Sequence, residues 1–512
     1  MNTTTADDRR IALVFWSGMA LVAAPALWFP VPFSWDFFNH AARFSVLSAA
    51  PGDPVLRFYA VHWGVIPNLG IDALYWLLRD ILSPVSFLRC LWIVDILLMG
   101  AGAWLLSATL HGRPPVTILA VPVLSYNVLL TTGLFNFALG AGLGLVCLSL
   151  WLRLRDRPVA MRLVAFNVMA VLLFFAHLVA FAVTVGLIGL METFPRLRWP
   201  RWADIVRGVA VAPFFVAGLV LLLASEPLET KVGFAVEKNL KTLLYAPLAS
   251  VSLLSDQVAM LGLAAVLFLI IRRGGCRFDP RMSAALLVAY LVVLAMPTSY
   301  GPGSLLDARV HVYIAFVAVA SLSLRRPQAD TRGLVIAFAL LIAARVALVL
   351  GPWNAFLDDL ADVRRTLAAI PPQSRVLVGH VVDDVCEPKA ASPQLAHAYQ
   401  HAVAAAVLER GSFVHLLFTG RGMQPVEVRP EWRRFVLPWQ ALTPREVTEV
   451  LRDDAALAPT SGRVFDTFVL FHFGCRPAVP PAPGLVKAAE GRVDDVYRIA
   501  EDAPAPPPAP AR

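Results

Sequence analysis

Long apolar stretches separated by short polar segments fill the chain from Ile11 to Leu350 and then stop. A helix needs roughly 20 residues to cross the ~30 Å hydrocarbon core of a bilayer, and apolar stretches near this length recur throughout that region. The pattern predicts a mainly α fold with a polytopic α-helical membrane domain of about 11 spans. The predicted spans cover approximately residues 11–33, 87–110, 115–131, 137–152, 160–176, 178–191, 204–224, 255–271, 282–297, 311–324 and 333–350.

Beyond Asp358 the pattern changes to polar helical sequence interrupted by short β-branched runs. RVLVGHVV at 375–382 and VFDTFVLFHF at 464–473 favour strands, so this region is predicted to form a small α/β domain. The predicted domains are a transmembrane domain at 1–354 with outer loops at 34–86, 225–254 and 298–310, a soluble extracytoplasmic α/β domain at 355–502, and a Pro/Ala-rich tail at 503–512 that is expected to be disordered.

Composition points to the bilayer as solvent. Hydrophobic residues make up 58% of the 512 residues and charged residues only 16%. The net charge of +8 would suit nucleic acid, but most basic residues before 350 are arginines in short loops. We therefore expect membrane lipids and no nucleic acid as partners. Walker, dinucleotide-binding, HExxH and GxSxG motifs are absent from the sequence, which gives no support to soluble-enzyme chemistry.

The loop arginines set the predicted orientation. Arg9 and Arg10 precede the first apolar stretch, and although a cleaved signal peptide begins in the same way, Trp28 and Phe29 continue the stretch and favour a span. With the N-terminus in the cytoplasm, most loop arginines fall on the cytoplasmic side. An odd number of spans then places the C-terminal domain on the periplasmic, extracytoplasmic side of a multi-pass inner-membrane protein.

The side predicted for each arginine-rich loop also decides whether two ambiguous segments cross the membrane, because it fixes whether the number of spans between two loops is odd or even. Residues 160–191 are expected to cross twice, as two short helices that meet near His177. Residues 69–82 carry Asp72, Arg79 and Asp80 on an otherwise apolar stretch, so they are expected to form an amphipathic helix on the outer surface.

The densest group of candidate chemical residues follows the first span, in FSWDFFNHAARF at 33–44. In a helix that begins at Trp35, Asp36, His40 and Arg43 share one face, which predicts an ionisable stripe at the membrane surface. The carboxylate could accept a proton from a hydroxyl or hold a divalent cation, and its neighbours could orient it or bind phosphate. The alternative is that Asp36 caps the helix and pairs with His40 without a function.

Further polar residues gather on the same predicted side. His177, at a turn between two apolar segments, is expected to line a cavity or to be a satisfied structural residue. Asp95 lies within a span and is expected to pair with Arg345 or another buried group. The other polar residues of this side are Asp53, Arg57, His62, Lys231, Lys238, Lys241, Asp307, Arg309 and His311.

The C-terminal domain offers two weaker signals. His397 and His401 have the i, i+4 spacing that can present two imidazoles to one metal, but no third ligand stands at a telling spacing, so a solvated helix face is favoured. Cys386 and Cys475 each follow a predicted strand and are expected either to form a disulfide or to remain two free thiols.

Residues 1–350 resemble the GT-C glycosyltransferases in architecture. The resemblance is carried by Trp35-Asp36-Phe37-Phe38 after the first span, the surface helix that follows, the paired spans with Arg-rich inner loops and the outer C-terminal domain. That class includes the protein mannosyltransferases and the aminoarabinose transferases. The resemblance implies polyprenyl-phosphate sugars as donors and Asp36 as catalytic base or metal ligand. The chain departs from the class pattern where His62 is followed by one Pro only, and where Asn127 and Asn136 stand in place of a second acid. No metal is therefore assigned, and a divalent cation stays open.

The leading hypothesis is hexosyl or pentosyl transfer from a polyprenyl-phosphate donor to a lipid, glycan or protein hydroxyl at the outer leaflet. Asp36 would deprotonate the acceptor, and Arg57, Lys231 or Arg309 would stabilise the departing phosphate. The remaining substrate-binding candidates are His40, Arg43, His62 and His177. The alternatives are a transporter or flippase of a lipid-linked or small substrate, and a non-catalytic membrane scaffold.

Overall fold

The computed structural model divides into two compact units, of which the first contains Met1–Pro32, Gly64–Ala73 and Arg89–Pro352 and the second contains Phe33–Trp63, Leu74–Leu88 and Trp353–Arg512. The two units alternate along the chain, so the second unit contains two stretches that follow the first span as well as the C-terminal region. The structure describes residues 6–195, 198–226, 232–235, 242–300, 304–325, 331–381, 393–420, 422–435, 441–443, 446–453, 464–473 and 484–500.

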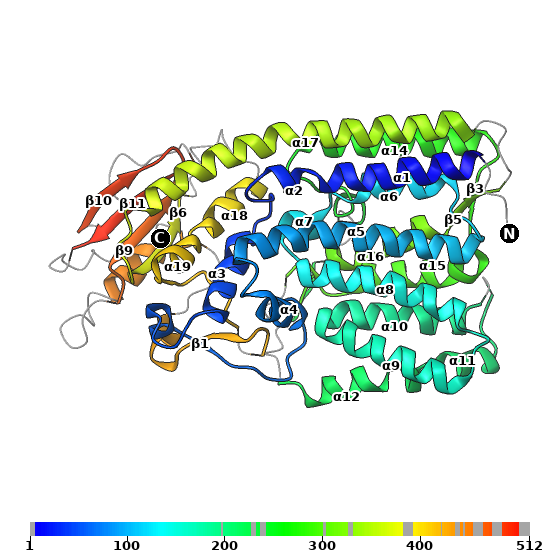
Figure 1. Ribbon diagram of the computed structural model, residues 1–512, viewed down its shortest axis with the longest axis horizontal. Helices are drawn as coiled ribbons and strands as arrows, with labels where there is room; N and C mark the ends of the chain where they lie inside the picture. The colour runs from blue at the N-terminus through cyan, green and yellow to red at the C-terminus, as the bar shows by residue number, and fades with distance from the viewer. Residues whose placement is uncertain are drawn as a thin grey trace. The chain divides into compact units, whose positions relative to one another are not determined.

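The first unit is built of apolar helices, and seven helical stretches among the described residues are long and apolar enough to cross a membrane (Figure 1). They are Ala6–Trp28, Pro84–His111, Phe135–Arg153, Val159–Ala176, Trp202–Ala224, Leu253–Arg272 and Thr331–Leu367. This confirms a multi-pass, mainly α membrane protein. The four other predicted spans coincide with shorter helical segments, so the number of crossings stays a prediction.

In chain order the helices of this unit are α1 (Ala6–Ala23), α2 (Pro25–Trp28), α5 (Pro84–His111), η2 (Val116–Leu119), α6 (Ala120–Leu124), α7 (Val128–Thr132), α8 (Phe135–Arg153), α9 (Val159–Ala176), α10 (Leu178–Thr193), α11 (Trp202–Val209), η3 (Ala212–Phe215), α12 (Val216–Ala224), α14 (Leu253–Arg272), α15 (Pro280–Ala295), α16 (Leu306–Ser321) and α17 (Thr331–Leu367). Two short strand pairs accompany them: β2 (Val232–Gly233) with β4 (Ser299–Tyr300), and β3 (Cys276–Phe278) with β5 (Leu322–Leu324). The unit boundary falls at Pro352, inside α17.

Small residues let the helices of the first unit approach closely. A Cβ at Gly102 of α5 would lie 2.7 Å from the Cβ of Leu145 on α8, and one at Gly142 of α8 would lie 2.7 Å from Cγ of Leu98. Glycine at these positions is what allows α5 and α8 to pack backbone to backbone, as small residues commonly do between membrane helices.

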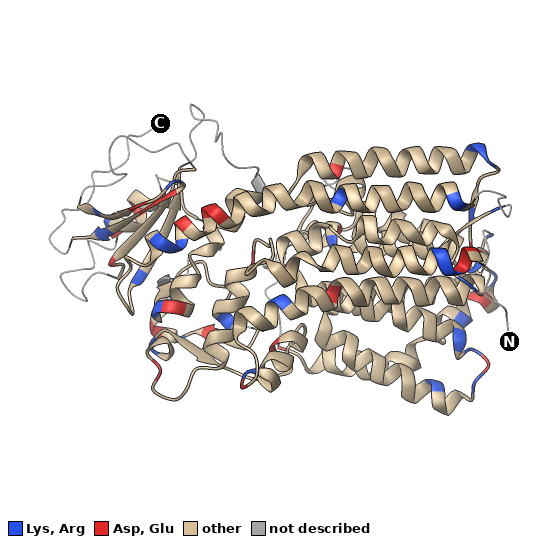
Figure 2. Ribbon diagram, turned by 45° about the horizontal axis from the view of Figure 1, so that its top comes forward, with Lys and Arg blue, Asp and Glu red and all other residues tan. Residues whose placement is uncertain are grey.

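Basic residues of the first unit gather at the end of the helices where the N-terminus lies (Figure 2). Contacts join the loops at this end: Arg113, after α5, pairs with Asp8 of α1 at 2.8 Å, and Arg281, at the start of α15, donates to the carbonyl of Leu110 at 2.7 Å. The segregation fits the predicted topology, in which these loops share one side of the membrane. The choice of the cytoplasm for that side stays a prediction.

The second unit contains a five-stranded mixed sheet in the order β10-β11-β9-β6-β7. Its strands are β6 (Arg375–His380), β7 (Phe413–Val414), β9 (Thr467–Phe471), β10 (Leu485–Glu490) and β11 (Asp494–Ile499). β6 runs parallel to β7 and β9, whereas β11 runs antiparallel to β9 and β10. The two β-branched runs therefore form the central strands β6 and β9, as predicted. Every residue of β9 is buried, which explains its unbroken apolar pattern.

Helices and a second strand pair complete the second unit. The helices are α3 (Phe37–Leu47), η1 (Pro54–Arg57), α18 (Pro393–Ala402), α19 (Ala405–Arg410) and η4 (Pro430–Phe435), and α4 (Gly70–Leu78) begins in the first unit and ends in this one. β1 (Tyr59–Val61) pairs antiparallel with β8 (Val426–Val428). Segments that are more than 300 positions apart in the sequence thus share one core.

The predicted surface stripe on α3 is wrong. His40 is only 8% exposed and Arg43 only 3%, and the phenylalanines on the other face of the helix are buried as well. α3 is a core helix because α18 and α19 pack against it. In α4, the helix predicted to lie on the outer surface, Asp72 is buried while Leu77 is 69% exposed, so this acid does not face solvent as predicted. Cys386, Cys475 and the 503–512 tail lie outside the described residues.

Candidate functional site

The carboxylate singled out after the first span is held by a histidine of the second unit. Oδ1 of Asp36, the residue preceding α3, lies 2.7 Å from Nδ1 of His401 in the last turn of α18. The Asp36 side chain is 15% exposed and that of His401 is 10% exposed. Asp36 makes no side-chain capping bond to α3, so the alternative in which it serves as a helix cap is not what the structure shows.

Aromatic rings lie beside this pair and beside the neighbouring His397. The indole of Trp35 packs on His397, one turn before His401, with ring centroids 4.9 Å apart. Phe418 meets the His401 ring edge to face at 5.6 Å. The predicted solvated face is therefore wrong for His401, although His397 stays exposed as a residue. Packing of this kind holds the imidazole of His401 in one orientation against Asp36.

Polar atoms next to Asp36 are buried without a hydrogen-bond partner among the described residues. They are Oγ of Ser34, Nε1 of Trp35 and both amide atoms of Asn39. Ser34 is 2% exposed and Asn39 is 1% exposed. A buried polar group that lacks a partner costs about 1–3 kcal/mol, so ordered water or a polar ligand is the expected partner here.

The other predicted residues of this loop have structural contacts of their own. Arg43 donates to the side-chain amide oxygen of Gln424, and its guanidinium lies 5.2 Å from the centre of the Phe44 ring. Arg57 is exposed at the end of η1, and the backbone N–H of His62 donates to the carbonyl of Pro425 at 2.7 Å. Lys231, Lys238 and Lys241 lie outside the described residues.

His177 stands at the break between α9 and α10, as predicted. The N–H of Val179 lies 3.1 Å from its Nδ1, and Nη1 of Arg309 on α16 lies 3.1 Å from its Nε2. Both neighbours can only donate, and a neutral imidazole has one acceptor nitrogen, so the ring accepts one of these two hydrogen bonds at a time. The Arg309 guanidinium places a positive charge beside the break, and a cation of this kind can bind phosphate or another anion.

The break at His177 is held by the segment around Asn68. The side-chain oxygen of Asn68 accepts from the N–H of Leu178 at 3.0 Å. A Cβ at Gly70 would lie 2.9 Å from the carbonyl oxygen of Phe175, so only glycine allows this close approach. The ring of Phe137 meets His177 at 5.1 Å. His177 is thereby fixed, and it is only 6% exposed.

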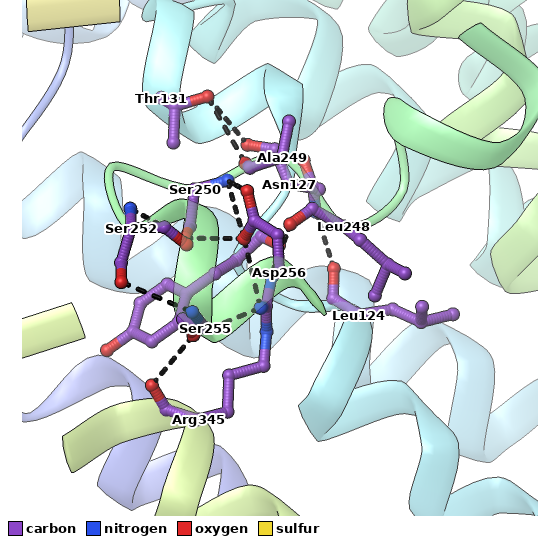
Figure 3. Close-up of polar contacts among 11 residues, drawn as sticks. Leu124, Asn127, Thr131, Leu248, Ala249, Ser250, Ser252, Ser255, Asp256 and Arg345 are labelled. Carbon is purple, nitrogen blue, oxygen red and sulfur yellow. Dashed lines mark hydrogen bonds and ion pairs between the residues drawn. The ribbon is translucent and has the colours of Figure 1, made fainter. Parts of the chain in front are cut away.

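A buried ion pair in the first unit escaped sequence reasoning (Figure 3). Nη1 of Arg345 on α17 lies 3.1 Å from Oδ1 of Asp256 on α14, and Nη2 donates to the carbonyls of Tyr126 at 2.7 Å and Leu248 at 2.6 Å. Asp256 also accepts from the hydroxyl of Ser250 at 2.6 Å. The pair joins α14 and α17 to the 246–252 segment and to the end of α6.

The network in Figure 3 corrects the expectation for Asp95. Arg345 is committed to Asp256 and does not pair with Asp95. Asp95 is fully buried in α5, and neither of its carboxyl oxygens has a hydrogen-bond partner among the described residues. Asp307 of α16 is also buried, and it accepts a hydrogen bond from the Thr242 hydroxyl at 2.6 Å.

The part of the chain that the structure describes contains no group of three or more His, Cys, Asp or Glu side chains with metal-binding geometry. The two asparagines that stand in place of a second acid have backbone partners. Asn127 caps α7 by accepting from the N–H of Leu129 at 3.0 Å, and Asn136 accepts from the N–H of Ile71 at 3.3 Å. Both are accounted for by local structure.

No protein-family model matches this chain. No curated protein matches its sequence either. Among solved structures, ArnT from Cupriavidus metallidurans bound to undecaprenyl phosphate superposes with a TM-score of 0.50 and 11% sequence identity, over 96% of this chain and 98% of that one. This chain has the fold of ArnT. The predicted resemblance to the GT-C glycosyltransferases is therefore confirmed at the level of the fold, and the ArnT-like architecture includes both the membrane helices and the C-terminal region.

Asp36, His177 and Arg309 were singled out from the sequence, whereas two groups were not. His401 was noticed for its spacing to His397, yet its partner could not be identified because that partner lies in another segment. Asp256 carries no motif and stands in an apolar helix, so only its burial beside Arg345 reveals it.

Proposed function

We propose that this protein is an integral membrane glycosyltransferase that moves a sugar from a polyprenyl-phosphate donor to a hydroxyl of a lipid, glycan or protein acceptor. The reaction breaks the bond between the anomeric carbon and the phosphate oxygen and forms a new bond from that carbon to the acceptor oxygen. Polyprenyl phosphate leaves with the electron pair, and the acceptor proton is passed to the enzyme. A membrane enzyme suits this donor because the polyprenyl chain stays in the bilayer.

The observation that carries the proposal is the placement of Asp36 in a chain with the ArnT fold. ArnT was crystallised with undecaprenyl phosphate, which supports a polyprenyl phosphate as the carrier in this chain too. Asp36 keeps part of its surface exposed and is held by His401 rather than by a helix terminus. A carboxylate oriented in this way serves general acid–base catalysis better than a flexible surface acid.

The His177–Arg309 pair supports the donor half of the proposal. The Arg309 guanidinium would bind the phosphate and stabilise the charge that develops on it as the sugar departs. Its contact with His177 holds this cation beside the break between α9 and α10.

The test compares Asp36→Asn with wild type in transfer from radiolabelled undecaprenyl-phosphate hexoses and pentoses to an extract of membrane lipids and glycans. We expect the variant to lose at least about 100-fold in rate while keeping its abundance in the membrane. The matched control is Asp53→Asn. Asp53 caps η1 by accepting from the N–H of Val55 at 3.0 Å, and an asparagine oxygen can do the same. Absence of transfer by wild type across the donor panel, or full activity of Asp36→Asn, would refute the proposal.

A further inference from the structure

We propose that His401 is the catalytic proton acceptor and that Asp36 orients it, so that the acceptor hydroxyl gives its proton to Nε2 of His401. This inference rests on the proposed glycosyl transfer and names the residue that completes its base. It assigns a catalytic role to the C-terminal region of the chain, which sequence reasoning had left without chemistry.

The hydrogen bond between the two residues fixes the tautomer of the imidazole. A carboxylate can only accept, so at the 2.7 Å separation Nδ1 of His401 must be the donor to Oδ1 of Asp36. In the neutral ring the other nitrogen, Nε2, then carries the lone pair. The carboxylate also stabilises the imidazolium that forms when Nε2 takes a proton. The two residues together form an acid–imidazole couple with its basic atom at Nε2.

The bond also changes what Asp36 itself can do. Oδ1 of Asp36 is occupied by His401, which leaves one carboxylate oxygen fewer for a substrate hydroxyl. Phe418 packs edge-on against the His401 ring, and Trp35 packs on the neighbouring His397. Such packing keeps the couple together and limits its hydration, and both effects favour proton transfer over simple ion pairing.

Ionisable neighbours of the couple lie on α18, at the end of β6 and at Glu446. His397 lies on the same face of α18 and is electrostatically coupled to His401, to Asp36 and to His380 at the end of β6. Glu446 acts in turn on His380. Burial lowers the pKa of His380, so this neighbour is expected to be neutral during catalysis. The hydrogen bond to the carboxylate distinguishes His401 from both other imidazoles.

The reaction step balances without a further reactant. The O–H bond of the acceptor breaks and its proton binds to Nε2 of His401. The oxygen lone pair forms the bond to the anomeric carbon, and the bond from that carbon to the phosphate oxygen breaks, its electrons leaving with polyprenyl phosphate. The imidazolium then returns its proton to solvent or to the departing phosphate.

The decisive variants separate proton acceptance from positioning. His401→Asn keeps an N–H donor near the place of Nδ1, so it can still hold Asp36, but it has no counterpart of Nε2. His401→Ala removes both functions. His397→Gln is the matched control, because it removes the neighbouring imidazole from the same helix without removing the bond to Asp36. Unfolding temperature and binding of undecaprenyl phosphate are measured for each variant to establish that it is folded.

We expect folded His401→Asn and His401→Ala both to lose at least about 100-fold in kcat, with His397→Gln within about threefold of wild type. In wild type, kcat/KM is expected to fall at acid pH. The residual activity of His401→Asn is expected to lack this fall. A folded His401→Asn that keeps its rate within tenfold, or a residual rate with the same fall at acid pH, overturns the inference. If wild type itself transfers no sugar, the proposed function fails instead, so the two failures are distinguishable.

Discussion

Nδ1 of His401 lies 2.7 Å from Oδ1 of Asp36, although 365 positions separate the two residues along the chain. The contact exists because α3, which follows the first membrane helix, folds into the same unit as the C-terminal region. The environment of Asp36 therefore forms only when α18 has packed against α3. Changes in either segment are expected to reach the same chemistry.

The first prediction concerns anion binding at the His177–Arg309 pair. Arg309→Gln removes the cation, and we expect its Kd for undecaprenyl phosphate to rise at least tenfold, because a charged hydrogen bond contributes about 1.5–3 kcal/mol. Native mass spectrometry or a lipid-binding titration of the full-length protein in detergent measures the change. Arg79→Gln is the control, since Arg79 stacks on Trp76 and takes no part in the proposed site. Equal affinities for wild type and Arg309→Gln would exclude this pair as the phosphate site.

The second prediction concerns the buried pair of Arg345 and Asp256. Arg345→Met leaves the Asp256 carboxylate buried without its cation, and we expect it to lower the free energy of unfolding by about 3–5 kcal/mol. The double variant Arg345→Met/Asp256→Leu should recover a substantial part of the lost free energy of unfolding, because no uncompensated charge is left.

The comparison for this pair is a pair near the surface. Arg155 and Glu192 lie 3.1 Å apart with Arg155 half exposed, and Arg155→Met is expected to cost at most about 1 kcal/mol. Denaturant titration of the detergent-solubilised protein gives all three values. A loss below about 1 kcal/mol for Arg345→Met would show that the network in Figure 3 does not hold α14 and α17 together.

The third prediction is a pH dependence that originates in the second unit. Burial raises the pKa of Asp494 in β11 to about 7, while the Thr366 hydroxyl, which donates to its Oδ2, acts in the opposite direction. Because the folded-state pKa lies above the unfolded one, the protonated form is favoured by folding. The resulting stabilisation is complete below about pH 4 and is lost as the pH rises through about 7, by an amount on the order of 4 kcal/mol.

Asp494→Asn tests this origin, because an amide does not titrate. The unfolding temperature of wild type should fall relative to that of Asp494→Asn between pH 5 and pH 8. Asp453→Asn serves as control, since Asp453 is 75% exposed and should leave the wild-type slope unchanged. Parallel curves for wild type and Asp494→Asn would contradict the prediction.

The fourth prediction compares two buried residues one turn apart on α5. Asp95 has no partner for its carboxyl oxygens among the described residues, so Asp95→Ala removes an unsatisfied polar group at the expense of a small cavity. We expect its stability to be within about 1 kcal/mol of wild type or higher. Leu91→Ala, by contrast, should lose about 2–5 kcal/mol because it only creates a cavity. A loss at Asp95 as large as that at Leu91 would reveal a stabilising role for the carboxyl group.

The sequence by itself determined where the helices and the main strands of this protein lie. Every predicted span coincides with a helical segment, and the runs at 375–382 and 464–473 contain β6 and β9. These are local properties, because the free energy of transferring a residue out of water depends chiefly on that residue and its near neighbours. The break at His177 was also predictable from the sequence, because the positions of the loop arginines limit the length of the membrane segments between them.

Only the tertiary structure decided what the polar residues do. α3 was predicted to lie at a surface because its sequence is amphipathic. In the structure α18 and α19 pack against α3 and its polar residues are buried, and nothing in residues 33–44 indicates that these helices will pack there. The partner of Asp36 and the partner of Arg345 were decided in the same way. A hydrogen bond depends on the positions of two groups to within a few tenths of an ångström, and for groups far apart in the chain only the folded packing sets those positions.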